Sequence, residues 1–245
     1  MSNRPSTLQD FPYSAGLQAI KDSLAFDDFD AFYRHLLDGL PQNSPETRRR
    51  YASLVTRWFF PHHELRGLLP RVWQAYHDDQ LLHELTRVTT LEMEPLIARF
   101  VTDVIFPISP GQPFQTATAR DYVVATYGIY KKNSRERLLN TVRLLGFLAR
   151  YDGRWVVAAI PRPANALLVL LHARLAPTPR IVRVADLLAA PFWQYLGFRQ
   201  ADEVRAVLHD AQAAGLIARY TMVDQLEQIT TKYTLDAYLE TALRL

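Results

Sequence analysis

The chain has 245 residues, of which 49% are apolar and 22% are charged, close to the usage of ordinary globular domains. It contains no cysteine, which excludes disulfide frameworks, thiolate nucleophiles and cysteine-ligated zinc. No apolar run reaches the roughly 18–20 residues of a membrane-spanning helix, and residues 1–10 lack the apolar stretch of a signal peptide. We therefore expect a cytoplasmic protein without a membrane span.

The net charge of +3 is unevenly distributed along the chain. Residues 118–160 hold eight basic and three acidic side chains, a net charge of +5. Residues 1–117 carry −3 and residues 161–245 carry +1. The middle region therefore holds more than the whole positive surplus.

The first hundred residues predict helices joined by short connections. Ser44 and Pro45 form a helix start, with serine as N-cap and proline at the first helical position, and Pro61 ends that helix. A Pro- and Gly-rich break follows at 107–113. The other helices predicted before this break cover residues 15–23, 27–38, 64–76, 78–87 and 90–105.

After the break, the pattern predicts helix, turn, helix and β-hairpin. A short helix over 118–127 precedes a basic turn at 131–133, and Ser134 caps a helix that runs to about residue 148. Two short strands within 149–158 flank an Asp-Gly turn. This is the order of a winged helix, with 90–105 supplying its first helix.

A similar order recurs at the C-terminus. Gly215 caps the third helix of this segment and separates it from a hairpin. The predicted elements are helices over 164–174, 185–195, 200–214 and 235–243, a strand over 180–184, and a hairpin of 216–222 with 228–233. The predicted fold is mainly α with small β-hairpins: an N-terminal helical region (1–88) followed by two winged-helix-like units (89–160 and 161–245).

Several short pieces of the sequence resemble the BrxA family of BREX bacterial phage-defence systems. They are Tyr13-Ser14-Ala15-Gly16-Leu17, Ser44-Pro45-Glu46-Thr47-Arg48-Arg49, Asn133-Ser134-Arg135-Glu136-Arg137 and Leu145-Gly146-Phe147-Leu148, within a match that spans roughly residues 13–155. The resemblance implies a non-enzymatic, helical, DNA-associating accessory protein, with other phage-defence proteins as partners.

The helix over 134–148 is the main candidate for DNA contact. Leu138, Leu139, Val142, Leu145 and Gly146 gather on one face, which we expect to be buried. In a winged helix the opposite face enters the major groove, where Arg reads guanine and Asn reads adenine. The predicted DNA-binding residues are Lys131, Lys132, Arg135, Arg137, Asn140, Thr141, Arg143 and Arg154. A solvated helix face that touches nothing is the alternative interpretation.

The corresponding helix over 200–214 carries acidic residues on its outer face, which would repel phosphate. We therefore expect this second unit to contact protein. The sequence does not decide whether that protein is a second copy of this chain in a homo-oligomer. Secondary phosphate contacts are predicted at Arg48, Arg49, Arg50, Arg57 and Arg199.

Catalytic, cofactor and metal motifs are absent from the sequence. There is no G-x-S-x-G elbow, Walker loop or G-x-G-x-x-G, and no His-Glu-x-x-His spacing. We therefore predict no catalytic residues, no cofactor and no metal. The favoured function is double-stranded DNA binding in a phage-defence assembly. The alternative is an interaction scaffold whose winged-helix units hold partner proteins, and RNA binding by the helical region is a weaker third.

Overall fold

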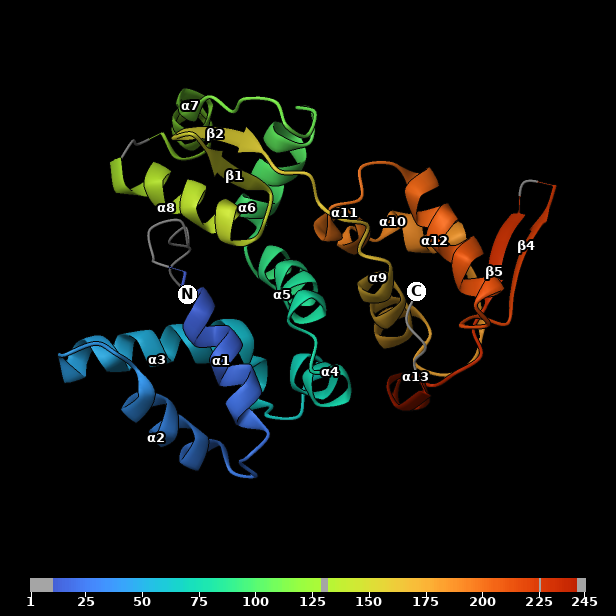
Figure 1. Cartoon of the computed structure of the whole chain (residues 1–245), viewed down its shortest axis with the longest axis horizontal. Coiled ribbons are helices and arrows are strands. Elements are labelled where there is room, and N and C mark those ends of the chain that lie inside the picture. The colour runs from blue at the N-terminus through green and yellow to red at the C-terminus, as the bar shows by residue number, and fades with distance from the viewer. Residues whose placement is uncertain (1–10, 129–131, 225, 242–245) are drawn as a thin grey trace. The chain divides into compact units, whose positions relative to one another are not determined.

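The structure, a computed structural model, describes residues 11–128, 132–224 and 226–241. It is mainly helical and contains two small antiparallel sheets, as predicted (Figure 1). The chain forms two compact units. Unit 1 comprises residues 1–70 and 89–161, and unit 2 comprises residues 71–88 and 162–245.

Unit 1 begins with three helices, two of which have starts capped by side chains. The Asp28 carboxylate accepts a hydrogen bond from the Ala31 amide at 2.8 Å, and the Ser44 hydroxyl accepts one from the Thr47 amide at 3.5 Å. The helix start predicted at Ser44 and Pro45 is therefore confirmed. The helices are α1 (Tyr13–Ser23), α2 (Phe29–Gly39) and α3 (Pro45–Phe59), followed by a 3-10 turn (Pro61–His63).

A glycine allows α1 and α3 to pack closely. Gly16 is buried in α1, and the Phe59 ring of α3 occupies the space where a Cβ of residue 16 would lie. Around this contact, the ring centroids of Phe11 and Trp58 are 4.6 Å apart. An aromatic cluster therefore anchors the N-terminal helices to one another.

The helix predicted over 90–105 is interrupted. α5 (Asp79–Met93) ends before Glu94, whose backbone is not helical, and α6 (Pro95–Phe100) begins at the next residue and continues into a π-helical turn (Val101–Ile105). Proline has no amide hydrogen and restricts the residue before it, so Pro95 starts a new helix.

The rest of unit 1 is a helix pair followed by a hairpin: α7 (Thr116–Tyr127), α8 (Lys132–Leu144), β1 (Leu148–Tyr151) and β2 (Arg154–Val157). Tyr151 pairs with Arg154, and both turn residues, Asp152 and Gly153, have positive φ, as the predicted Asp-Gly turn requires.

The break predicted at 107–113 also contributes to this sheet. Its end runs along the outer edge of β2, where Pro113 forms a bridge with Val156. The backbone bonds are Gly111 N–H to Val157 O (2.8 Å), Val157 N–H to Gln112 O (3.0 Å) and Phe114 N–H to Trp155 O (2.8 Å). The edge of β2 is thereby covered.

Unit 2 contains α9 (Ala164–Leu170), a π-helical turn (Leu171–Leu175), β3 (Ile181–Arg183), α10 (Val184–Ala189), α11 (Phe192–Leu196), α12 (Ala201–Ala213), β4 (Arg219–Val223), β5 (Leu226–Thr230) and α13 (Leu235–Thr241). The sheet has the order β3-β5-β4 and is antiparallel. The helix predicted over 185–195 is broken at Ala190, whose ψ of 133° is extended because Pro191 follows.

The two compact units divide the chain differently from the three predicted regions. Residues 71–88, which cover most of α4 (Leu68–Tyr76) and of α5, group with the C-terminal part of the chain. Side chains from this segment reach the C-terminal part: the Arg87 guanidinium donates to Leu196 O at 2.6 Å, the Tyr76 hydroxyl donates to Tyr238 O at 3.5 Å, and Arg71 forms an ion pair with Asp236. No periodicity in the sequence indicates such distant partners.

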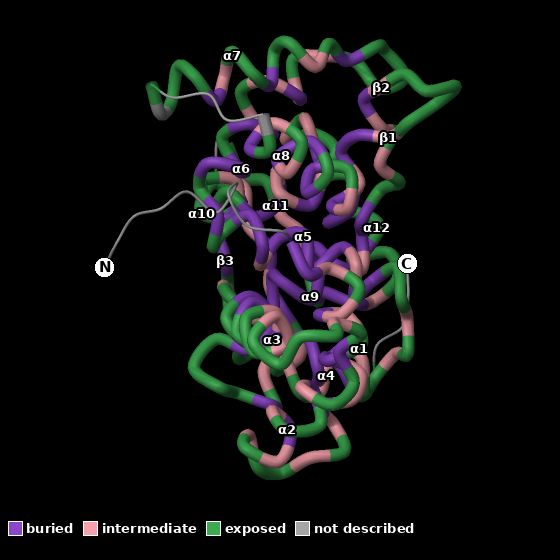
Figure 2. Tube along the Cα trace, turned by 90° about the vertical axis from the view of Figure 1, so that its left-hand side faces the viewer, coloured by how far each residue is buried: buried purple, intermediate pink, exposed green. Residues whose placement is uncertain are grey.

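A histidine lies in the core of unit 2. His172 is fully buried in the π-helical turn after α9, a helix that is buried along most of its length (Figure 2). Its Nδ1 lies 2.8 Å from Leu168 O, and its ring stacks on Tyr238 with centroids 4.2 Å apart. Burial lowers the pKa of His172, because the charged imidazolium loses its hydration.

We expect this histidine to make unit 2 less stable in acid. The unfolded chain takes up a proton near the ordinary pKa of 6.5, whereas the folded chain resists it, so stability falls as the pH drops below that value. His172→Phe keeps a ring against Tyr238 and removes the titration. Urea unfolding at several pH values in this range gives the free energy of unfolding. This free energy should depend less steeply on pH in His172→Phe than in the wild type. In the control His209→Phe, which replaces an exposed histidine, it should depend on pH as it does in the wild type. An equal pH dependence in His172→Phe and wild type would contradict this account.

Candidate nucleic-acid interface

Helix α8 buries its predicted apolar face. Leu138, Leu139, Val142 and Leu145 are each at most 3% exposed. Asn133, Glu136, Asn140 and Arg143 are exposed, and their spacing of three or four residues places them in one row along the helix. The predicted inward face is confirmed for the four apolar residues, and the predicted outward face is confirmed for Glu136, Asn140 and Arg143.

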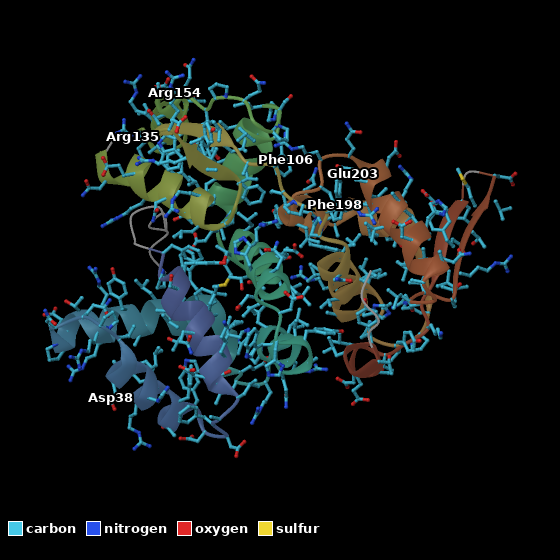
Figure 3. All side chains as sticks on the ribbon, viewed as in Figure 1. Asp38, Phe106, Arg135, Arg154, Phe198 and Glu203 are labelled. Atoms are coloured by element: carbon cyan, nitrogen blue, oxygen red, sulfur yellow. The ribbon has the colours of Figure 1, made fainter. Side chains whose placement is uncertain are left out.

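The other predicted DNA-binding residues differ in exposure. Arg154 is exposed at the start of β2, and Arg135 and Arg137 are half-buried on α8. Lys131 and the side chain of Lys132 lie outside the described residues. Figure 3 shows Arg135 and Arg154 on this same unit.

The predicted position of Thr141 is wrong. We predicted it on the outer face of the helix, but it is only 4% exposed. The buried arc of α8 is wider than the apolar residues alone indicate, since Ser134, on the same side of the helix, is also buried. Thr141 therefore belongs to the core and leaves the set of residues able to reach a ligand.

A groove of about 840 Å³ lies between α8 and the hairpin. It is lined by Thr116, Arg135, Glu136, Leu139, Asn140, Arg143, Leu148, Ala149, Arg150 and Trp155. Three of these side chains are arginines and one is a carboxylate. The groove therefore brings together Arg135, Asn140 and Arg143 from the predicted set, and it carries a net positive charge.

Neighbouring side chains orient the polar groups of this groove. Arg143 Nη2 donates to Asn140 Oδ1 at 2.9 Å, which leaves the Asn140 amide nitrogen as a donor. Arg135 Nη2 lies 3.8 Å from Glu136 Oε1, while Arg135 Nε is buried without a hydrogen-bond partner among the described residues. The groove thus presents guanidinium and amide donors, the groups that bind phosphate and base edges.

Two residues of the groove, Arg150 and Trp155, were not among the predicted ones. They are direct cross-strand partners, and the Arg150 guanidinium lies 4.7 Å from the centroid of the Trp155 ring. The two-residue Asp-Gly turn fixes this register, so the pairing could have been read from the sequence once the turn type was assigned.

None of the predicted secondary phosphate contacts lines this groove. On α3, Arg49, Arg50 and Arg57 are exposed, and Arg50 and Arg57 lie two turns apart on one side. Arg48 instead donates from Nε to Gln42 O at 2.5 Å, which holds its side chain against the chain before α3. The structure therefore leaves three of these four arginines exposed to solvent.

Arg199 belongs to unit 2, next to the acidic start of α12. Burial lowers the pKa of Arg199, an effect that Glu203 opposes. The Glu203 carboxylate also accepts from the backbone amides of Arg199 and Gln200 and so caps α12 (Figure 3). The outer face of α12 continues with Arg205 held between Asp202 and Glu227, both at 2.9 Å. Its acidic groups are thus partly neutralised within the unit.

Within residues 11–128, 132–224 and 226–241, no three His, Asp or Glu side chains come together as a metal site would require. Across the same residues, no helix combines the length and apolar character needed to cross a membrane. No protein-family model, curated protein or solved structure matches the chain.

Proposed function

We propose that unit 1 binds double-stranded DNA through α8 and the β1–β2 hairpin, as a non-enzymatic accessory protein of a BREX-like phage-defence assembly. The observation that carries the proposal is the convergence of Arg135, Arg143 and Arg150 on one open groove. The order of α7, α8 and the hairpin supports a winged-helix-like mode of binding, with α8 toward the major groove and Arg154 on the wing. The phage-defence context rests on the sequence resemblance to the BrxA family.

The charge of this region suits a polyanion. Residues 118–160 carry a net charge of +5, and arginines that neutralise phosphates release the counterions condensed on DNA. The hydrogen bond between Arg143 and Asn140 holds two base-reading side chain types next to each other on the exposed row of α8. These features favour both a non-specific phosphate contribution and a smaller contribution from base contacts.

A protein-interaction scaffold is the second candidate, and the tip of the β4–β5 hairpin favours it. Met222 and Val223 are 69% and 65% exposed, and Leu226 is 48% exposed. Large apolar side chains gathered at one exposed tip are typical of contact surfaces. Unit 2 would then hold a partner protein while unit 1 binds DNA.

Replacing groove and wing arginines tests the DNA proposal. Arg143→Ala and Arg154→Ala should each weaken the binding of a short blunt duplex, because each removes a cation that faces the phosphates. The dependence of log K on log salt concentration should become shallower by roughly one unit for each phosphate that is no longer neutralised. Fluorescence anisotropy across a salt series measures both quantities.

Arg219→Ala is the matched control, since it removes one exposed arginine from a β-strand outside unit 1. Its affinity and salt dependence should equal those of the wild type. If the wild type shows no association with duplex DNA at low salt and tens of micromolar protein, DNA binding is wrong and the scaffold is favoured. Equal weakening of binding in all three variants would mean that net charge alone holds the DNA.

A further inference from the structure

The groove of unit 1 contains an aromatic ring in addition to its arginines. Trp155 is half-buried and lines the groove, while its apolar neighbours Leu139 and Leu148 belong to the core. Phosphate binding needs cations and donors only, so it leaves the accessible part of the Trp155 ring unexplained. A ligand that uses the whole groove must offer both an anion and a flat apolar face.

The Arg150–Trp155 pair offers such a ligand a stacking surface. The guanidinium lies 4.7 Å from the ring centroid, and the two residues are held opposite each other by the hairpin register. Unpaired bases stack on aromatic rings and on arginine guanidinium planes. The pair stands on two hydrogen-bonded strands, so its position is set before a ligand arrives.

The donors around this pair suit a phosphodiester and a base edge. Arg135 and Arg143 both line the groove, and Arg143 is oriented by Asn140. Glu136 supplies one carboxylate at the same groove, an acceptor for the amino group of a base. The groove volume of about 840 Å³ falls within the range of clefts that hold small ligands, roughly 300–1,000 Å³.

Bases inside a duplex cannot use this surface, because their faces are covered by the neighbouring base pairs. The base of an unpaired nucleotide has an uncovered face and can stack on this surface. We propose that the groove between α8 and the hairpin takes an unpaired nucleotide of DNA at a single-stranded extension of a duplex. Its base stacks on the Arg150–Trp155 pair, and its phosphates meet Arg135 and Arg143. The inference rests on the proposed DNA binding by unit 1 and names the DNA structure that it selects.

Two fluorescent probes test this inference: a blunt duplex, and the same duplex with a short single-stranded thymidine extension. The wild type should bind the extended probe about tenfold more tightly, which is within the contribution of base–aromatic stacking. Trp155→Ala should remove this preference, because it should weaken the extended probe about tenfold more than it weakens the blunt duplex. Trp155→Phe should keep most of it, because a phenyl ring also stacks.

Two further variants keep the test independent of folding defects. Arg150→Lys preserves the charge but removes the guanidinium plane, so the preference should fall while the salt dependence stays. Tryptophan emission should be quenched by the extended probe in wild type and in Trp73→Phe, which changes the half-buried Trp73 of unit 2. In Trp155→Phe this quenching should disappear.

Equal affinity of the wild type for the two probes would overturn the inference and leave duplex binding intact. Two other results would also overturn it: tryptophan quenching that persists in Trp155→Phe, and an Arg150→Lys variant that binds both probes more weakly by the same factor. Failure of the wild type to bind the blunt duplex would instead overturn the proposed duplex binding. The two proposals therefore fail on different measurements.

Discussion

Gly16→Ala should lower the free energy of unfolding of unit 1 by about 1–3 kcal/mol, the usual effect of an overpacked core. The direction is opposite to intrinsic helix propensity, since alanine is favoured over glycine inside a helix by about 1 kcal/mol. The reason is the close approach of α1 and α3, where the added Cβ would overlap the Phe59 ring. That ring is 3% exposed and has little room to move.

The matched control is Gly39→Ala in α2, where an added Cβ would have no described atom within 4 Å other than those of its chain neighbours and of the helix backbone around it. This variant should be neutral or more stable by up to about 1 kcal/mol, because alanine restricts the unfolded chain. Urea unfolding followed by circular dichroism measures both. If Gly16→Ala stabilised the protein as Gly39→Ala does, the proposed packing of α1 on α3 would be wrong.

Arg87→Met should destabilise unit 2 by about 2 kcal/mol, within what losing a hydrogen bond made by a charged group costs. Arg87 is 2% exposed, and its guanidinium donates to Leu196 O at 2.6 Å. Methionine retains much of the aliphatic volume but leaves that carbonyl without its donor, and it removes the positive charge near Glu84.

Arg57→Met is the control for this prediction, because Arg57 is exposed on α3. Its free energy of unfolding should change by no more than about 0.5 kcal/mol. Chemical denaturation of the three proteins, with the denaturant dependence compared to verify similar unfolding, gives the values. A change in Arg87→Met as small as that in Arg57→Met would show that the buried guanidinium contributes no net stability.

Local signals in the sequence predicted local structure well. Ser44 with Pro45 marked the start of α3, and Asp152 with Gly153 marked the hairpin turn. The two interrupted helices show where periodicity misled us. Apolar spacing continued through Pro95 and Pro191, but the missing amide hydrogen and the restricted preceding residue ended each helix there.

Only part of the candidate site could be predicted from the sequence. The exposed row of α8 follows from helical spacing, so Asn140 and Arg143 were predicted correctly as exposed. Thr141 was misplaced because a hydroxyl at the border of an apolar face gives no sign of which side it joins. The pairing of Arg150 with Trp155 follows from the Asp-Gly turn, but their place in the groove depends on how the hairpin packs beside α8, which is a tertiary feature.

The cover on the outer edge of β2 has a consequence for how the groove assembles. The hairpin closes a short loop and can form early, but the bonds from Gly111 and Phe114 to β2 close a loop that contains both α7 and α8. Closing a longer loop has a larger entropic cost, which must be met by contacts made at the same time. The helical and strand walls of the groove should therefore become ordered together, in one cooperative step, rather than the hairpin adding to a finished helix pair.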